Sequence, residues 1–348
     1  MKNCKIYIEN GIVLDGKTNS EADFTTFGEL VFTTAMTGYQ EIITDPSFAG
    51  QIIVMSYPLI GNYDIKECFN QSDGIYLKAM IVSNADNNKR FVEFLQEKNV
   101  LLITIDTRKL IHIIRDLFYP KCVISTKDLT KPELNKYYQM INPNIVHEIS
   151  TKTVKIINGN IQNNRTIGIL DFGLKYGIIE ELKKYFSKIF VLPYNYRYKD
   201  IEGLGLDTVL LSNGPGNPDI LYSVIENIKN ILGKIPVYGI CLGHQLLALA
   251  LNCQMQIMQI GHRGANHPVM NVETGKIIIT AQNHGYEIIE NSLTDDVIVT
   301  HRNIHDSSIE GIKSKKYNAQ SVQFHPEASP GPNDAKGIFC EWFEKFII

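Results

Sequence analysis

In the second half of the chain, short runs of apolar residues alternate with longer stretches in which apolar residues recur every three or four positions. The short runs predict buried strands, and the longer stretches predict amphipathic helices. The strands are expected at residues 166–172, 188–193, 207–213 and 235–240, and the helices at residues 175–186, 219–232 and 243–251. Apolar strands separated by helices are typical of a parallel sheet covered on both faces. From residue 276 the pattern turns strand-rich, before a last predicted helix over residues 334–346.

The first part of the chain lacks this alternation. Its strand-like segments lie at residues 31–34, 51–56, 74–82 and 100–105, and its helical spacing at residues 90–98 and 108–117. A polar stretch rich in Asn and Lys follows. We therefore predict an α/β protein with a mixed α+β domain over residues 1–150, a linker over residues 151–165, and a domain with a mainly parallel sheet covered by helices over residues 166–348.

Composition narrows the class of protein. The 348 residues include 34 Lys and Arg against 37 Asp and Glu, which gives a net charge of -3. This balance lacks the basic excess that nucleic-acid binding exploits, so nucleic acid is not expected as the main ligand. The first residues lack the apolar region that a leader peptide would contain. No run of 18 apolar residues occurs, so we expect a soluble chain without a membrane partner.

The cysteines and histidines do not predict a metal centre. The six cysteines are far apart and form no C-x-x-C pair. His301 and His305 are four residues apart, but no carboxylate pattern accompanies them. We therefore expect a reducing compartment and no metal in this chain.

Cys241 lies in the segment Gly239-Ile240-Cys241-Leu242-Gly243, between a predicted strand and a predicted helix. This pattern is typical of a nucleophile elbow, in which glycines allow a cramped turn that presents the side chain at the edge of the sheet. The N-terminus of the following helix would favour the thiolate form of the sulfur. The alternative is a buried core cysteine beside a helix start.

Two further segments follow predicted strands of the same domain. His325-Pro326-Glu327 offers a base and a carboxylate to orient it, although such a pair is usually a surface pair. Residues 212–218 contain Gly214-Pro215-Gly216, which would let main-chain N–H groups approach a ligand closely, or would form an ordinary tight turn. Ligands in parallel sheets bind beyond the carboxyl ends of the strands, so a nucleophile, a base and an oxyanion loop are expected to meet there.

The segments GICLGHQ, LSNGPG and HPEAS, in this order, resemble the triad-type (class I) glutamine amidotransferases. Within that family, MTGYQEIITDPSFAGQIIVMSYPLIGN and IDTRKL in the first half, with DFGLKYGI, NHPV and TAQNHGY, resemble the small subunits of carbamoyl phosphate synthetase. The resemblance covers nearly the whole chain. Gly177 and Asn217 depart from the family pattern, which usually has Asn and Asp there.

The resemblance implies roles for particular residues. Cys241 would be the nucleophile, His325 the general base and acid, and Glu327 the carboxylate that orients His325. The N–H groups of Leu242 and Gly214 would form the oxyanion hole. Glutamine would be bound by residues of both domains, namely Ser47, Gly214, Gly216, Leu242, Gln245, Asn283, Gly285 and Tyr286. From the residues alone, Ser47 reads as a turn or helix-capping serine after Asp45-Pro46.

The resemblance also implies a partner. Ammonia released from L-glutamine would pass to a large subunit, in a heterodimer or a higher assembly. The large subunit would make carbamoyl phosphate from bicarbonate and two ATP with magnesium, for arginine and pyrimidine synthesis, while this chain would need no cofactor. The 49 Ile and 29 Asn, and 27 Lys against 7 Arg, are typical of AT-rich genomes. A plastid (chloroplast) stroma or a bacterial cytoplasm would therefore fit.

Three alternatives stay open at this point. The chain could be the glutaminase subunit of another synthase, such as anthranilate synthase, although the additional first domain argues against this. It could be a stand-alone cysteine hydrolase that is fully active without a partner. An inactive binding module is disfavoured, because Cys241, His325 and Glu327 are all present.

Overall fold

The computed structural model describes residues 1–84, 89–118 and 120–346. The chain forms two compact units, Met1–Pro143 and Asn144–Ile348. The sequence pattern placed the end of the first domain at residue 150, a few residues later. The short helix α5 (Val146–Ile149) therefore belongs to the second unit.

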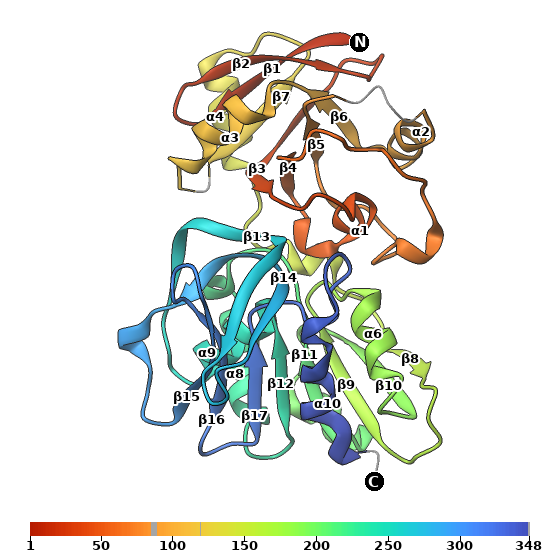
Figure 1. Ribbon diagram of the computed structural model, residues 1–348, viewed down its shortest axis with the longest axis vertical. Coiled ribbons are helices and arrows are strands. Elements are labelled where there is room, and N and C mark those ends of the chain that lie inside the picture. Colours follow the sequence, from red (N-terminus) through yellow and green to blue (C-terminus); the bar gives the residue numbers. More distant parts are fainter. Residues whose placement is uncertain (85–88, 119, 347–348) are drawn as a thin grey trace. The chain divides into compact units, whose positions relative to one another are not determined.

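The described strands of the first unit form a closed barrel in the order β1-β2-β6-β5-β4-β3-β7 (Figure 1). The run from β3 to β6 is parallel, and the other pairings are antiparallel. The strands are β1 (Lys2–Ile8), β2 (Val13–Thr18), β3 (Thr25–Thr33), β4 (Gln51–Met55), β5 (Ala79–Val82), β6 (Leu101–Thr104) and β7 (Lys121–Ser125). The helices are α1 (Tyr39–Thr44), α2 (Lys89–Glu97), α3 (Thr107–Arg115) and α4 (Lys131–Gln139).

The strand-like segments that the pattern indicated in this unit correspond to β3, β4, β5 and β6, and the helical segments correspond to α2 and α3. The pattern did not indicate β1, β2 and β7, which close the barrel. Ile6 of β1 is paired with Ile124 of β7, far along the chain. A pairing of such long range leaves no local signal, because only the folded barrel brings the two strands together.

The second unit contains a ten-stranded sheet in the order β14-β13-β15-β16-β17-β12-β11-β9-β10-β8. The five strands from β17 to β10 are parallel, and the strands on either side of them are antiparallel. The strands are β8 (Lys155–Asn158), β9 (Thr166–Asp171), β10 (Lys188–Pro193), β11 (Thr208–Leu211), β12 (Val237–Ile240), β13 (Met255–Asn271), β14 (Ile277–Ile288), β15 (Val297–Asn303), β16 (Ile309–Ser314) and β17 (Ala319–Val322).

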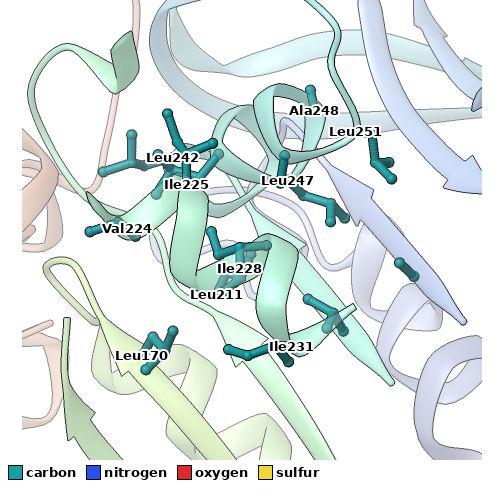
Figure 2. Packing of buried hydrophobic residues seen from close by; sticks show 14 of the residues in the cluster. Leu170, Leu211, Val224, Ile225, Ile228, Ile231, Leu242, Leu247, Ala248 and Leu251 are labelled. Atoms are coloured by element: carbon teal, nitrogen blue, oxygen red, sulfur yellow. The ribbon is translucent and has the colours of Figure 1, made fainter. Parts of the chain in front are cut away.

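Helices cover both faces of the parallel strands. The longer ones are α6 (Tyr176–Leu182), α8 (Tyr222–Ile231), α9 (Leu242–Ala250) and α10 (Gly337–Phe343), and α7 (Tyr198–Ile201) is one turn. Apolar residues of α8 and α9 pack together with Leu170 and Leu211 of the sheet (Figure 2). A second cluster contains residues of α6 and α10, including Ile178 and Phe339. The expected α/β fold, with a parallel sheet buried on both faces, is confirmed.

The polar segment 151–165 differs from the linker that its composition suggested. Its residues Lys155–Asn158 form β8, which pairs antiparallel with β10 at the edge of the sheet. Three of the four side chains of β8 are exposed. An edge strand has one neighbour and buries little, so it can form within a segment whose overall composition is that of a loop. In the part of the chain that the structure describes, no helix is long and apolar enough to cross a membrane.

Candidate active site

Cys241 lies between β12 and α9, as the elbow pattern predicts. Its backbone has φ 54 and ψ -106, a strained conformation for a residue with a side chain. The N–H of Cys241 donates to the carbonyl oxygen of Val322 in β17 at 3.0 Å. The sheet therefore holds the cysteine in a turn that it would not adopt by itself.

The two glycines of the elbow are required by close backbone contacts. A Cβ atom on Gly239 would lie 2.6 Å from the carbonyl oxygen of Gly243. A Cβ atom on Gly243 would lie 2.1 Å from the carbonyl oxygen of Leu211, at the end of β11. No side chain fits at either position, so the glycines allow the helix to start directly above the sheet.

His325 and Glu327 form the pair that their spacing suggested. Nδ1 of His325 lies 2.7 Å from Oε1 of Glu327, and both side chains are buried. The backbone N–H of His325 donates to the carbonyl oxygen of Ala281 at 2.9 Å, which attaches this loop to β14. Because Nδ1 is bound by the carboxylate, Nε2 is the nitrogen left to act on a substrate.

A buried lysine completes this group. Nζ of Lys175 lies 2.9 Å from Oε1 of Glu327 and donates to the carbonyl oxygen of Ala328 at 2.7 Å. Lys175 is the residue before α6, and its side chain is 2% exposed. No sequence motif assigned a role to Lys175. The only local signal is a lysine among apolar residues at the carboxyl end of a buried strand.

The charges of this group shift its proton equilibria. Burial is the largest single influence on the pKa of His325 and lowers it, and the charge of Lys175 also lowers it. The negative charge of Glu327 and the interactions with Cys241 together outweigh both, and the pKa rises to about 10. Burial would raise the pKa of Glu327, but Lys175 and then His325 lower it to about 2. At neutral pH, Glu327 is therefore ionised and His325 carries a proton.

The sulfur of Cys241 lies between the His325 loop and β14. Sγ lies 3.6 Å from the carbonyl oxygen of Asn283, and the thiol is near enough to His325 to affect its pKa. The structure thus brings Cys241, His325 and Glu327 together in the second unit. Here a thiol lies beside an imidazole whose protonated form is stabilised by a carboxylate. This arrangement is typical of a cysteine nucleophile with a histidine that acts as its acid and base.

The predicted glutamine-binding residues of the second unit lie in the loop after β11, in α9 and in β14. Gly214 and Gly216 lie in the loop after β11, and the N–H of Gly243 donates to the carbonyl oxygen of Ser212 at 3.0 Å, which joins that loop to the elbow. Leu242 is the first residue of α9. Nε2 of Gln245, one turn further on, donates to Oε1 of Gln323 at 3.1 Å. The predicted residues of β14 are Asn283, Gly285 and Tyr286.

Ser47 lies in the first unit, in the 3-10 turn Pro46–Phe48. Its backbone N–H donates to Oδ1 of Asp45 at 2.8 Å, and the residue is buried. Asp45, and not Ser47, caps the turn. The part that Ser47 would play in binding glutamine stays a prediction.

Comparisons with known proteins cover both units. Residues 6–124 match the family model "Carbamoyl-phosphate synthase small chain, CPSase domain", and residues 168–345 match "Glutamine amidotransferase class-I". The chain is 44% identical to the carbamoyl phosphate synthase small chain of Clostridium acetobutylicum over 97% of its own length and 98% of the relative's. The chain belongs to the carbamoyl phosphate synthase small-chain family. This confirms the family that the sequence motifs indicated.

The chain is also similar to the carbamoyl phosphate synthase pyrimidine-specific small chain of Bacillus subtilis. The two are 41% identical over 98% of this chain and 95% of the relative. Among solved structures, a glutamine amidotransferase from Thermotoga maritima is 18% identical, with a TM-score of 0.39, over 53% of this chain and 84% of that one. The match at residues 6–124 is to the small-chain domain, which argues against a glutaminase subunit of another synthase.

Proposed function

We propose that this chain is the glutamine-hydrolysing subunit of a carbamoyl phosphate synthase, and that Cys241 is its nucleophile. The observation that carries the proposal is the position of Cys241 on a strained strand-to-helix turn beside the buried His325–Glu327 pair. Strained backbone is retained where function needs it, and here it presents a thiol to a charged imidazole.

The first half of the reaction uses the proton on His325. The cationic imidazole stabilises a thiolate on Cys241, which attacks the side-chain amide carbon of glutamine. As the tetrahedral intermediate collapses, Nε2 of His325 gives its proton to the departing nitrogen. Ammonia leaves, and a γ-glutamyl thioester remains on Cys241. Glu327, fixed by Lys175, keeps the imidazole ring oriented during the transfer.

The second half uses His325 in its neutral form. A water molecule gives a proton to Nε2 and attacks the thioester carbon. The carbon–sulfur bond breaks, glutamate leaves, and Cys241 and His325 return to the thiolate and imidazolium forms. We propose that the N–H groups of Leu242 and Gly214 stabilise the oxyanion in both halves. Removal of one such donor lowers kcat by about 10²- to 10³-fold.

The same proposal assigns the substrate contacts. Gly216, Gln245, Asn283, Gly285 and Tyr286 would bind the amino-acid part of glutamine, together with Ser47 of the first unit. Nδ2 of Asn283 supports this role, because it is a buried donor with no hydrogen-bond partner in the described part of the protein. A buried amide of this kind is costly unless a ligand pairs with it.

The partner would be a large subunit that receives the ammonia. It would use bicarbonate and two ATP with magnesium to make carbamoyl phosphate, for arginine and pyrimidine synthesis, in a heterodimer or a larger assembly. This chain would need no cofactor for glutamine hydrolysis. The composition, rich in Ile, Asn and Lys, would fit a plastid stroma if the gene is organelle-encoded, and a bacterial cytoplasm otherwise.

The test is reconstitution with a large subunit. We expect the isolated chain to release glutamate slowly, and to accelerate when it is bound to a large subunit supplied with ATP and bicarbonate. A poorly placed oxyanion donor at Gly214 in the free chain would be enough to act as the switch. Equal glutamate release with and without the large subunit would instead favour a stand-alone cysteine hydrolase.

A further inference from the structure

A second buried group of titratable side chains lies on the antiparallel strands of the second unit. It consists of His262 in β13, His284 in β14 and Glu310 in β16. One nitrogen or oxygen atom from each of these residues lies within 4.8 Å of the others. All three residues are buried, and Glu310 is 0% exposed. The mechanism of glutamine hydrolysis uses none of their side chains.

The ring of His262 is oriented from outside the group. Its Nε2 lies 2.8 Å from Oδ2 of Asp306, so the proton on Nε2 is donated to that carboxylate. Its Nδ1 then faces Oε1 of Glu310 at 3.2 Å. Longer contacts of 3.4 Å join Nδ2 of Asn303 to Nδ1 of His262, and Oγ of Ser308 to Oε1 of Glu310.

The ring of His284 is oriented in the same way. Its Nδ1 lies 3.0 Å from the backbone carbonyl oxygen of Tyr286, and in the tautomer with the proton on Nδ1 that nitrogen donates to the carbonyl. Its Nε2 then faces inward, 3.0 Å from Oε1 of Gln282 and 3.8 Å from Oε1 of Glu310.

The orientation of the Gln282 amide is decided by a neighbour. The hydroxyl of Thr280 donates to the carbonyl oxygen of His267 at 2.9 Å. It therefore accepts from Nε2 of Gln282, at 3.1 Å, which leaves Oε1 of Gln282 directed at His284. Several lone pairs thus point into one buried space, and Oε2 of Glu310 has no hydrogen-bond partner in the described part of the protein.

We propose that His262, His284 and Glu310 bind a zinc ion. Two imidazoles and a carboxylate are a zinc donor set, and tetrahedral ligands at zinc distances lie about 3.3 Å apart. The observed 3.2 and 3.8 Å separations from Oε1 of Glu310 are near this value. The pairing of each outer imidazole nitrogen with a carboxylate or a carbonyl is the arrangement that holds metal-binding histidines in other proteins.

The alternative is a cluster without an ion, in which one proton joins Nδ1 of His262 to Oε1 of Glu310 across 3.2 Å. That proton would not pair Oε2 of Glu310, which has no hydrogen-bond partner in the described part of the protein, and would not bridge the 3.8 Å between Oε1 of Glu310 and Nε2 of His284. A zinc ion would bind all three side chains at once. The ion would join β13, β14 and β16, and would hold the segment of β14 that also carries Asn283 and Tyr286.

The experiment is a metal titration of the full-length chain. The protein is stripped with a chelator, and its thermal unfolding and metal content are measured with and without added Zn²⁺. We expect one zinc per chain and a higher Tm. Glu310→Gln, which preserves shape, should weaken zinc binding at least tenfold, whereas Glu273→Gln, at an exposed position beside β14, should bind zinc like the wild type.

A cobalt spectrum distinguishes a metal bound at this site from a metal bound by cysteine thiols. Cys68 and Cys340 are exposed cysteines that could bind a metal. We expect Co²⁺ to show the visible absorption of tetrahedral nitrogen and oxygen ligands, without a sulfur-to-metal charge-transfer band. The proposal would be overturned if the stripped wild-type protein bound neither ion, or if the cobalt spectrum showed thiolate ligands. It would also be overturned if the Glu310→Gln protein bound zinc as tightly as the wild type. If Glu310→Gln does not fold, the wild-type titration and the cobalt spectrum decide.

Discussion

Lys175 and Glu327 form a buried ion pair, with 2.9 Å between Nζ and Oε1. The same carboxylate oxygen lies 2.7 Å from Nδ1 of His325. The carboxylate of Glu327 is therefore held from two sides, by a buried lysine and by the imidazole of His325. In the proposed mechanism, Lys175 is a positioning residue, because it would act on the reaction through Glu327.

Lys175→Met should destabilise the protein. Removal of one partner from a buried ion pair leaves an uncompensated charge, which costs about 3 to 5 kcal/mol. Here His325 still faces Glu327, so the lower end of that range is expected. Denaturant unfolding of the variant measures the loss. Lys229→Met, which removes an exposed pair with Glu226, is the control and should cost less than about 1 kcal/mol.

Glu327→Gln should change the pH dependence of glutamine hydrolysis. The charge of Glu327 is the largest of the influences that offset burial and raise the pKa of His325 to about 10. Without that charge, burial and Lys175 lower this pKa, so the imidazolium loses its proton at a lower pH. The alkaline limb of kcat/KM should move to lower pH, and kcat should fall. The profile of the exposed-site control Glu344→Gln should overlay the wild type, and an unmoved limb in Glu327→Gln would contradict this account.

Cys241→Ser should abolish glutamine hydrolysis. A serine hydroxyl is not ionised beside His325 at neutral pH, and so lacks the nucleophilic strength of a thiolate. Carbamoyl phosphate synthesis from added ammonia, measured with the large subunit present, should survive and serves as the control for folding. Substantial glutamate release by the variant would show that another residue is the nucleophile.

Gly243→Ala should distort the elbow. The new Cβ would lie 2.1 Å from the carbonyl oxygen of Leu211, so the backbone must move, at a cost of about 1 to 3 kcal/mol. Glutaminase activity should fall by more than the loss of folded protein explains, because Cys241 would be displaced. Gly337→Ala is the matched control, since no atom outside its chain neighbours and its own helix backbone lies within 4 Å of its Cβ position. Thermal unfolding and steady-state kinetics of both variants make the comparison.

Ser47→Ala should raise the KM for glutamine more than it lowers kcat. A hydrogen bond to bound substrate exists before the chemical step and contributes about 0.5 to 1.5 kcal/mol net. The measurement is steady-state glutamate release by the complex with the large subunit. An unchanged KM would leave Ser47 as a residue of the turn that Asp45 caps.

The sequence indicated correctly those features that depend on neighbouring residues. The elbow around Cys241 needs glycines at fixed spacing, and Glu327 binds the histidine two positions before it, so both patterns are visible in a short segment. The alternation of apolar strands and amphipathic helices likewise indicated the parallel sheet, because burial on both faces requires it.

Tertiary structure alone decided the features that join distant residues. Lys175 meets Glu327 only when the carboxyl ends of β9 and β17 lie at the same edge of the sheet. The group of His262, His284 and Glu310 forms only after three antiparallel strands have paired. β8 lies in a segment that is polar as a whole, and it becomes a strand because β10 offers it a hydrogen-bonding edge. Such contacts leave no periodic signal, since their energy comes from partners that the chain meets only on folding.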